Sequence, residues 1–237
     1  MAAVDQHSTY KEDPWGRLTA TSQYLTDTTF GDKARAEAAA ARVRQIHEHV
    51  KGIDDFTGLP YDAEDPELLL WIHCAEVDSF LAGYRTFGGR LTQDEADRYV
   101  AEMVVASELV GCPAEIVPTD ESSLQAYLHD QELVASPPAK DAMRFILFPP
   151  VVWPGGSYPR IPGGRILEIP ARAGWSLPSA AAVALLPDRA RRAYRLPNIR
   201  PTLPALKLAM PAFIKAIQIV APPPPELAAL QARINAA

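Results

Sequence analysis

The sequence predicts an all-α protein, and three observations support this fold class. The segment 65–89 begins with Asp65 and Pro66, ends with two glycines, and is apolar around most of a helix circumference. The segment 32–51 is rich in alanine, the residue with the highest intrinsic helix propensity. No stretch sustains the alternation of apolar and polar residues that is typical of a half-buried strand. We expect a single domain that spans residues 1–237.

Five helices are expected in the N-terminal part of the chain. They are, in order, 13–30, 32–51, 65–89, 92–110 and 119 to about 137, with a turn-rich loop at 53–64. Pro14 lies in the first turn of the first helix, and Gly31 ends it. Thr92 and Glu95 form a capping box at the start of the fourth helix. Thr119 is the expected N-cap of the fifth.

The C-terminal part is expected to contain shorter helices around an irregular segment. A Gly/Pro-rich stretch at about 149–170 predicts an irregular lid or a long surface excursion. Helices are predicted at 141–148, 178–186, 188–195 and 203–220. Pro211 should kink the last of these. The prolines at 222–225 predict a stiff spacer before a final short amphipathic helix.

Composition excludes several classes of function and indicates a compartment. The formal net charge of -6 and the pI near 5.4 argue against a nucleic-acid partner, which would favour a basic surface. The most apolar candidate for a membrane span, 203–221, is interrupted by Lys207, Pro211 and Lys215. Cys74 and Cys112 are the only cysteines, and Cys74 lies in an apolar helix. We therefore expect a cytoplasmic protein without a membrane span.

Two histidines replace apolar residues at core-facing positions of predicted helices. His47 follows the stripe of Ala40 and Val43, and His73 lies on a stripe with Leu69 or Leu70, Val77, Phe80 and Tyr84. A buried imidazole needs either a hydrogen-bonding neighbour or a metal. The other three histidines, which are His7, His49 and His129, are expected to face solvent and are assigned no role.

The metal alternatives differ in how well the sequence matches them. There is no zinc motif, and neither histidine has the glutamate that a di-iron Glu-x-x-His pair requires. Cys74 is interpreted as a core thiol. Haem needs only one strong protein ligand and apolar walls, so His73 could ligate its iron. His47 and Arg44 could then line the opposite face, where Arg44 or Arg42 could meet a propionate or polarise dioxygen.

Several short segments also resemble a known family. They are 41–52 (ARVRQIHEHVKG), 60–66 (PYDAEDP), 70–79 (LWIHCAEVDS), 87–89 (FGG), 94–99 (DEADRY) with Glu102, and 109–113 (LVGCP), with His7, Asp13-Pro14 and Arg17 near the start. In these segments the chain resembles the DUF2236 family, which groups the MpaB-type oxygenases with the catalytic domain of latex-clearing rubber oxygenases. The resemblance is dense to about residue 127 and diffuse beyond it.

This resemblance implies an all-helical fold that binds haem b and cleaves a carbon–carbon double bond of an isoprenoid with dioxygen. His73 matches the proximal haem ligand, and Arg44 matches the distal arginine of the rubber-cleaving members. His47 falls where those members carry a lysine, and Glu48 where they carry a threonine. A histidine at that position implies either a second iron ligand or a hydrogen-bond donor to dioxygen. Because of these departures, the rubber substrate does not carry over.

Together, these observations predict a haem b-dependent oxygenase-like oxidoreductase. We expect it to act with dioxygen on an apolar, unsaturated, isoprenoid-like small molecule, and apolar residues of the last helices could mediate a homodimer contact. The alternative is a haem-free helical binding or scaffold protein for an apolar ligand. In that alternative both core histidines would pair with carboxylates, for example His73 with Glu76 or Asp78.

Overall fold

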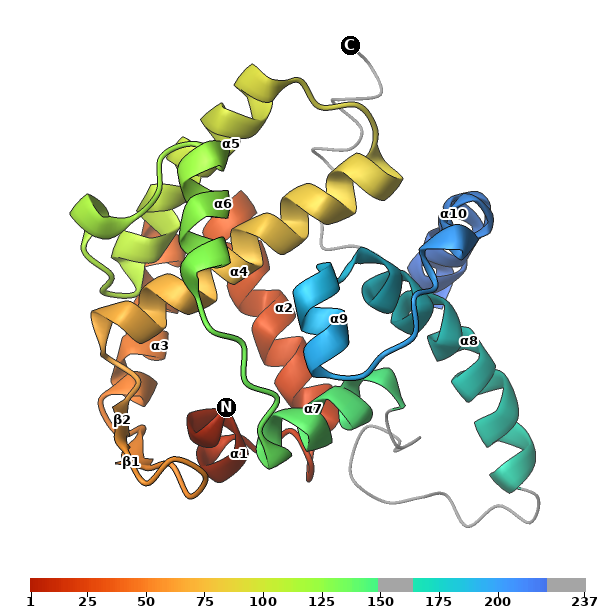
Figure 1. Ribbon diagram of the computed structural model, residues 1–237, viewed down its shortest axis with the longest axis horizontal. Coiled ribbons are helices and arrows are strands. Elements are labelled where there is room, and N and C mark those ends of the chain that lie inside the picture. The colour runs from red at the N-terminus through yellow and green to blue at the C-terminus, as the bar shows by residue number, and fades with distance from the viewer. Residues whose placement is uncertain (149–163, 221–237) are drawn as a thin grey trace. The chain divides into compact units, whose positions relative to one another are not determined.

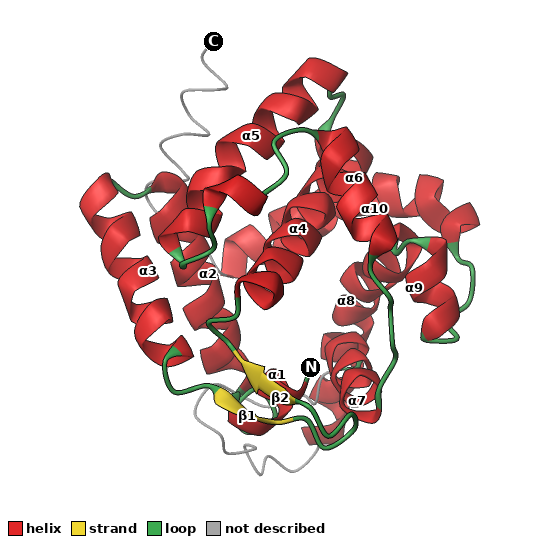
Figure 2. Cartoon of the chain, turned by 60° about the vertical axis from the view of Figure 1, so that its left-hand side comes forward, coloured by secondary structure: helices red, strands yellow, loops and turns green. Residues whose placement is uncertain are grey.

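The computed structural model describes residues 1–148 and 164–220, and the segments 149–163 and 221–237 lie outside the described residues. The regular secondary structure of the described chain is helical except for one two-stranded sheet, which confirms the all-α class (Figures 1 and 2). The chain groups into a first unit (Met1–His7 and Glu37–Val134) and a second unit (Ser8–Ala36 and Ala135–Ala237). The expectation of a single domain over residues 1–237 stays a prediction.

The first unit is built around the long apolar helix that the sequence predicts. Its elements are α1 (Ala2–His7), most of α3 (Lys33–His47), β1 (Lys51–Ile53), β2 (Pro60–Asp62), α4 (Pro66–Gly83), a π-helical turn (Tyr84–Gly88), α5 (Gln93–Leu109), a 3-10 turn (Ala114–Ile116) and α6 (Glu121–Asp130). Helix α4 packs against α5 and α6 (Figure 1). Their shared core consists of Leu69, Leu70, Cys74, Val77, Leu81, Ala96, Val100, Cys112, Val117, Leu124 and Leu128. Burial of this apolar surface is the main favourable contribution to the unit's stability.

Local signals place the ends of these helices as the sequence predicts. The Asp65 carboxylate accepts a hydrogen bond from the Glu67 amide at 2.9 Å, with Pro66 in the first turn of α4. The capping box of Thr92 and Glu95 is present at the start of α5. These helix starts depend on residues a few positions apart, so the sequence alone specifies them.

The end of α3 differs from the prediction. This helix stops at His47 instead of continuing to Lys51, and the chain then forms an antiparallel hairpin in which Lys51 pairs with Asp62 and Gly52 with Tyr61. Each strand has three residues, which is too short for a period-two pattern to be recognised. A side chain at Gly52 would come within 2.6 Å of the Tyr61 hydroxyl, so the close pairing requires glycine there.

Two further details of the first unit also differ from the prediction. The predicted helix 65–89 ends in the π-helical turn rather than in regular α-helix, and the amide of Gly89 donates to the Tyr84 carbonyl at 3.1 Å. Helix α6 is capped by Asp120, whose carboxylate accepts from the Ser123 amide at 2.8 Å, and not by Thr119. The helix that was expected to continue to about residue 137 ends at Asp130.

The second unit contains the remaining helices. They are α2 (Pro14–Phe30), α7 (Pro137–Leu147), α8 (Gly164–Leu185), α9 (Asp188–Ala193) and α10 (Leu203–Val220), with a 3-10 turn (Arg200–Thr202) before α10. Helix α8 packs against α7 and α10. Pro137 begins α7 behind the N-cap Ser136, although the sequence analysis predicted that a helix would end there. Helix α10 has the predicted bounds and contains Pro211, and the kink expected there stays a prediction.

The irregular segment predicted at about 149–170 is wrong in its last part, because residues 164–170 belong to α8. The rest of that segment, 149–163, and the proline run at 222–225 with the helix expected after it lie outside the described residues. Within the described ranges, no helix combines the length and the apolar character that crossing a bilayer requires.

Candidate functional site

His73 lies in the middle of α4 and is buried, with 8% of its surface exposed. Leu69, Leu70 and Val77, one turn before and one turn after it, are buried as well. The prediction that this imidazole occupies a core-facing position is therefore confirmed. The aromatic residues further along the same stripe behave differently, because Phe80 is 44% exposed and Tyr84 is 51% exposed. The expectation that these two aromatic side chains belong to the core is wrong.

The His73 ring has no hydrogen-bond or ion-pair partner among the residues that the structure describes. Burial alone lowers the pKa of this imidazole, since no neighbouring charge opposes the effect. The ring is therefore neutral near pH 7 and keeps one nitrogen lone pair. A neutral imidazole with a lone pair that no donor occupies is the form that binds a metal.

Neither of the two carboxylates that could have paired with His73, Glu76 and Asp78, forms a hydrogen bond or ion pair with it in the described chain. Asp78 accepts a hydrogen bond from the Gln125 side chain at 2.6 Å. Glu76 is half-buried, and burial raises the pKa of its carboxyl group. Its charge also contributes, after burial, to the raised pKa of Tyr99 on α5. In the described chain, the polar network that the scaffold alternative requires around His73 is not formed.

His47 is the last residue of α3 and is half-buried. Its Nδ1 atom is buried and has no hydrogen-bond partner within the described residues. Burial lowers the pKa of His47, and the charge of Glu64 partly opposes this shift. The Glu64 carboxylate itself accepts a hydrogen bond from the Lys51 ammonium group at 2.7 Å. His47 is thus a second imidazole whose buried nitrogen lacks a protein partner.

Arg44 lies one turn before His47 on α3 and is exposed. Its guanidinium group donates a hydrogen bond to the carbonyl of Leu109, the last residue of α5. A cation at this position satisfies a carbonyl that has no partner within its own helix and interacts favourably with the helix dipole. Arg44 therefore joins α3 to the end of α5, a contact that the sequence analysis did not predict.

The three predicted site residues, Arg44, His47 and His73, all belong to the first unit. No hydrogen bond or ion pair joins any two of them in the described ranges. Within those ranges no group of three or more His, Cys, Asp or Glu side chains could hold a metal ion together. A single imidazole without a protein partner in the described chain is compatible with a prosthetic group that needs only one strong protein ligand, as haem does.

The thiols are poor candidates for a reactive site. Cys74 and Cys112 are both free and buried. Burial, with a smaller contribution from Cys112, raises the pKa of Cys74 to about 12. A thiol of this kind is protonated near pH 7 and is neither a nucleophile nor a thiolate ligand. This agrees with the interpretation of Cys74 as a core thiol.

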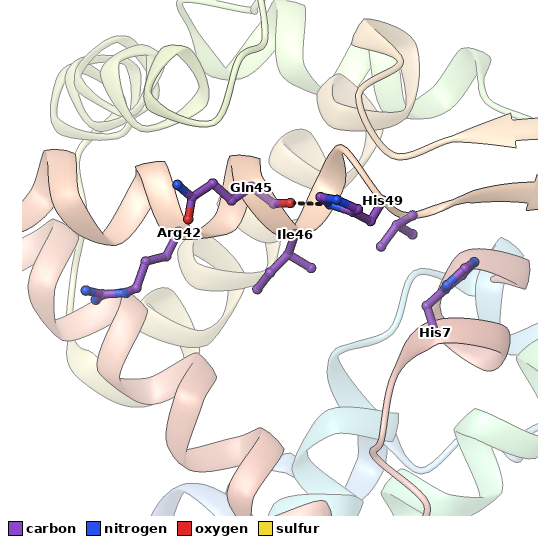
Figure 3. A pocket seen from close by; sticks show the side chains of 6 residues that line it. His7, Arg42, Gln45, Ile46 and His49 are labelled. Carbon is purple, nitrogen blue, oxygen red and sulfur yellow. Dashed lines mark hydrogen bonds between the residues drawn. The ribbon is translucent and has the colours of Figure 1, made fainter.

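An open cleft of about 530 Å³ lies elsewhere on the first unit, along the side of α3 (Figure 3). It is lined by His7, Arg42, Gln45, Ile46, His49 and Val50. His49 donates from Nδ1 to the Gln45 carbonyl at 2.9 Å, because a carbonyl oxygen can only accept. Arg44, His47 and His73 do not line this cleft. It is therefore a feature separate from the predicted site.

The comparison with protein families gives a match over most of the chain. Residues 1–217 match the family model described as "ER-bound oxygenase mpaB/B'/Rubber oxygenase, catalytic domain". No curated protein and no solved structure matches the chain.

Proposed function

The chain belongs to the mpaB/rubber oxygenase catalytic-domain family, and from this premise we propose that it is a haem b-dependent oxygenase. In this proposal His73 would hold the haem iron, and Arg44 and His47 would act on dioxygen. The observation that carries the proposal is the buried, neutral His73 imidazole without a protein partner. No described residue occupies the lone pair of this imidazole, and an iron ion would take that place.

Each residue contributes through its own chemistry. When bound, haem supplies the iron centre at which dioxygen is activated. His73 would hold the group through one ring nitrogen, with the buried Leu69, Leu70 and Val77 of α4 around it. Arg44 is permanently charged and can stabilise negative charge that develops on oxygen. His47 is neutral near pH 7 and can donate a hydrogen bond from a ring nitrogen.

An apolar substrate is supported by the surface that continues from His73 along α4. Phe80 and Tyr84 share the helical stripe of His73 and are about half exposed. Large exposed apolar side chains beside a buried ligand residue are typical of a surface that an apolar group covers. We therefore propose an unsaturated, isoprenoid-like hydrocarbon chain as substrate and dioxygen as co-substrate.

The haem proposal is tested by titrating the purified chain with haem and recording the Soret band. His73→Gly should abolish the band, and added imidazole should restore it, because free imidazole can replace the missing ligand. His49→Gly, which changes an exposed histidine, is the matched control and should bind haem as the wild type does. A wild-type protein that takes up no haem, or a His73→Gly protein that binds it unchanged without imidazole, would overturn the assignment.

The substrate proposal is tested with short isoprenoids under dioxygen, with carbonyl products detected by mass spectrometry. Phe80→Ala should raise KM with little effect on stability, because the side chain is already half exposed. Val105→Ala, an exposed apolar position on α5, is the control and should leave KM unchanged. Haem-loaded protein that forms no carbonyl product from any isoprenoid would exclude this substrate class.

Compartment and assembly complete the proposal. Two free cysteines are compatible with a reducing compartment, and we propose that the protein is cytoplasmic.

Helix α10 exposes three large apolar side chains, which are those of Leu208, Ile214 and Ile217, and we propose that they form a homodimer contact. The Leu208→Lys variant should then have a lower sedimentation coefficient than the wild type, because it would no longer dimerise. A wild type that sediments as a monomer would exclude the dimer.

A further inference from the structure

Arg191 in the second unit carries a buried positive charge that its protein neighbours only partly satisfy. The residue is 7% exposed. Its Nη2 atom donates to Oδ1 of Asp188 at 2.6 Å. Its Nη1 atom is buried and has no hydrogen-bond partner in the described chain. A buried, charged donor without an acceptor is strongly unfavourable, and the described residues do not supply an acceptor for this atom.

The surroundings of Arg191 carry an excess of positive charge. Oδ1 of Asp188 also forms an ion pair with Nη1 of Arg200 at 2.9 Å. One carboxylate therefore faces two guanidinium groups, which leaves one positive charge uncompensated in this cluster. Nη2 of Arg200 donates to the Leu186 carbonyl at 3.0 Å, which holds that side chain beside α9.

The sequence around this cluster differs sharply from the rest of the chain. Residues 188–200 contain five arginines and one acidic residue, in a chain whose formal net charge is -6. The basic residues are all arginine, whose planar fork matches the geometry of carboxylate and phosphate oxygens better than lysine does. The charge distribution and the unpartnered Nη1 atom are separate observations, and both indicate an anionic ligand.

We propose that Arg191 and Arg200 form a binding site for an oxyanion, with a carboxylate or phosphate oxygen accepting from Nη1 of Arg191. Asp188 orients both guanidinium groups and neutralises only one of them. The Arg200 side chain is about two-fifths exposed, so the cluster of Asp188, Arg191 and Arg200 borders solvent. This proposal concerns residues of the second unit and does not depend on haem binding.

The test is the thermal unfolding of the full chain with inorganic phosphate, and separately with acetate, at constant ionic strength. Constant ionic strength matters because general screening would otherwise change the stability. Wild type should show a saturable rise in Tm of a few degrees. Arg191→Lys keeps the charge beside Asp188 but removes the fork, so it should weaken the response about tenfold or abolish it. Arg192→Lys, an exposed position on the same helix, should respond as the wild type does.

Comparing phosphate with acetate shows whether the site binds a phosphate or a carboxylate group. A response to phosphate alone identifies a phosphate group, and a response to acetate alone identifies a carboxylate; either supports the site. A wild type that responds to neither anion, or an Arg191→Lys protein that responds fully, overturns it. Should Arg191→Lys fail to fold, as judged by circular dichroism, Arg200→Lys takes its place and must weaken the response.

Discussion

Burial acts in opposite directions on His73 and Glu76, which lie three positions apart on α4. It lowers the pKa of the imidazole and raises the pKa of the carboxyl group, because a charged form is disfavoured in both cases. Burial therefore disfavours charge on both groups of this helix segment. Such a segment suits an apolar prosthetic group better than a charged ligand.

Glu76→Gln should raise the stability of the haem-free protein at neutral pH. The folded-state pKa of Glu76 lies above the ordinary value of 4.5, so the native state disfavours the carboxylate. The penalty is absent below about pH 4.5 and appears as pH rises through the folded-state pKa. The urea midpoint of the variant should therefore exceed that of wild type at neutral pH and approach it in acid.

The control for this comparison is Glu102→Gln on α5, where the side chain is largely exposed and forms a long surface ion pair with Arg98. Its midpoint should follow that of wild type closely. A Glu76→Gln protein that is less stable than wild type at neutral pH would show that the carboxylate has a stabilising partner.

At the scale of secondary-structure elements, two alanine variants can show whether Asp120 or Thr119 is the N-cap of α6. Asp120→Ala should cost about 1 kcal/mol of unfolding free energy, because its carboxylate accepts from the Ser123 amide. Thr119→Ala should cost much less, since Thr119 lies outside the helix and is exposed. Chemical denaturation of both variants measures the difference, and equal losses would mean that the cap is not at Asp120.

Two glycines in the first unit should respond to alanine in opposite directions. Gly111 follows α5 with φ at 102°, so Gly111→Ala should destabilise the protein by about 1 kcal/mol or more. Gly83 ends α4 with helical φ of -62°, and an added Cβ would meet no atom within 4 Å. Gly83→Ala should therefore stabilise the protein by about 0.5–1 kcal/mol. Thermal unfolding of the pair checks both signs, and two changes of the same sign would contradict the backbone argument.

At the scale of the whole molecule, the haem-free protein should lose stability in mild acid. Burial lowers the pKa values of His47 and His73 below the ordinary histidine value of 6.5, so the unfolded chain binds these protons at a higher pH than the native state does. The unfolding free energy should therefore fall as pH decreases from about 7.5 to about 5.5. Denaturant titrations at several pH values measure this slope.

Two double variants separate this effect from the titration of other groups. Replacing His47 and His73 together by glutamine should flatten the slope. The same change at the exposed His49 and His129 should leave it close to that of wild type. If the two double variants show the same slope, the buried histidines do not control the acid response.

Most of the secondary structure could be predicted because helix ends depend on local chemistry. Asp65, Thr92 and Gly31 act on residues within one turn, and the structure places each of them at the predicted end of its helix. Pro137 was misinterpreted because a proline pair can follow one helix or begin the next. The hairpin was missed because three-residue strands depend on their pairing partner and not on their own pattern.

The sequence by itself determined the all-α class, the central apolar helix, and the presence of imidazoles at core-facing positions of two helices. Each of these depends on helical periodicity and on local propensity. Only the tertiary structure decided that the ring of His73 has no partner in the described chain, that Arg44 meets the end of α5, and that a nitrogen of Arg191 is buried without an acceptor. These features depend on which distant residues approach each side chain, and the spacing of residues along one chain does not specify that.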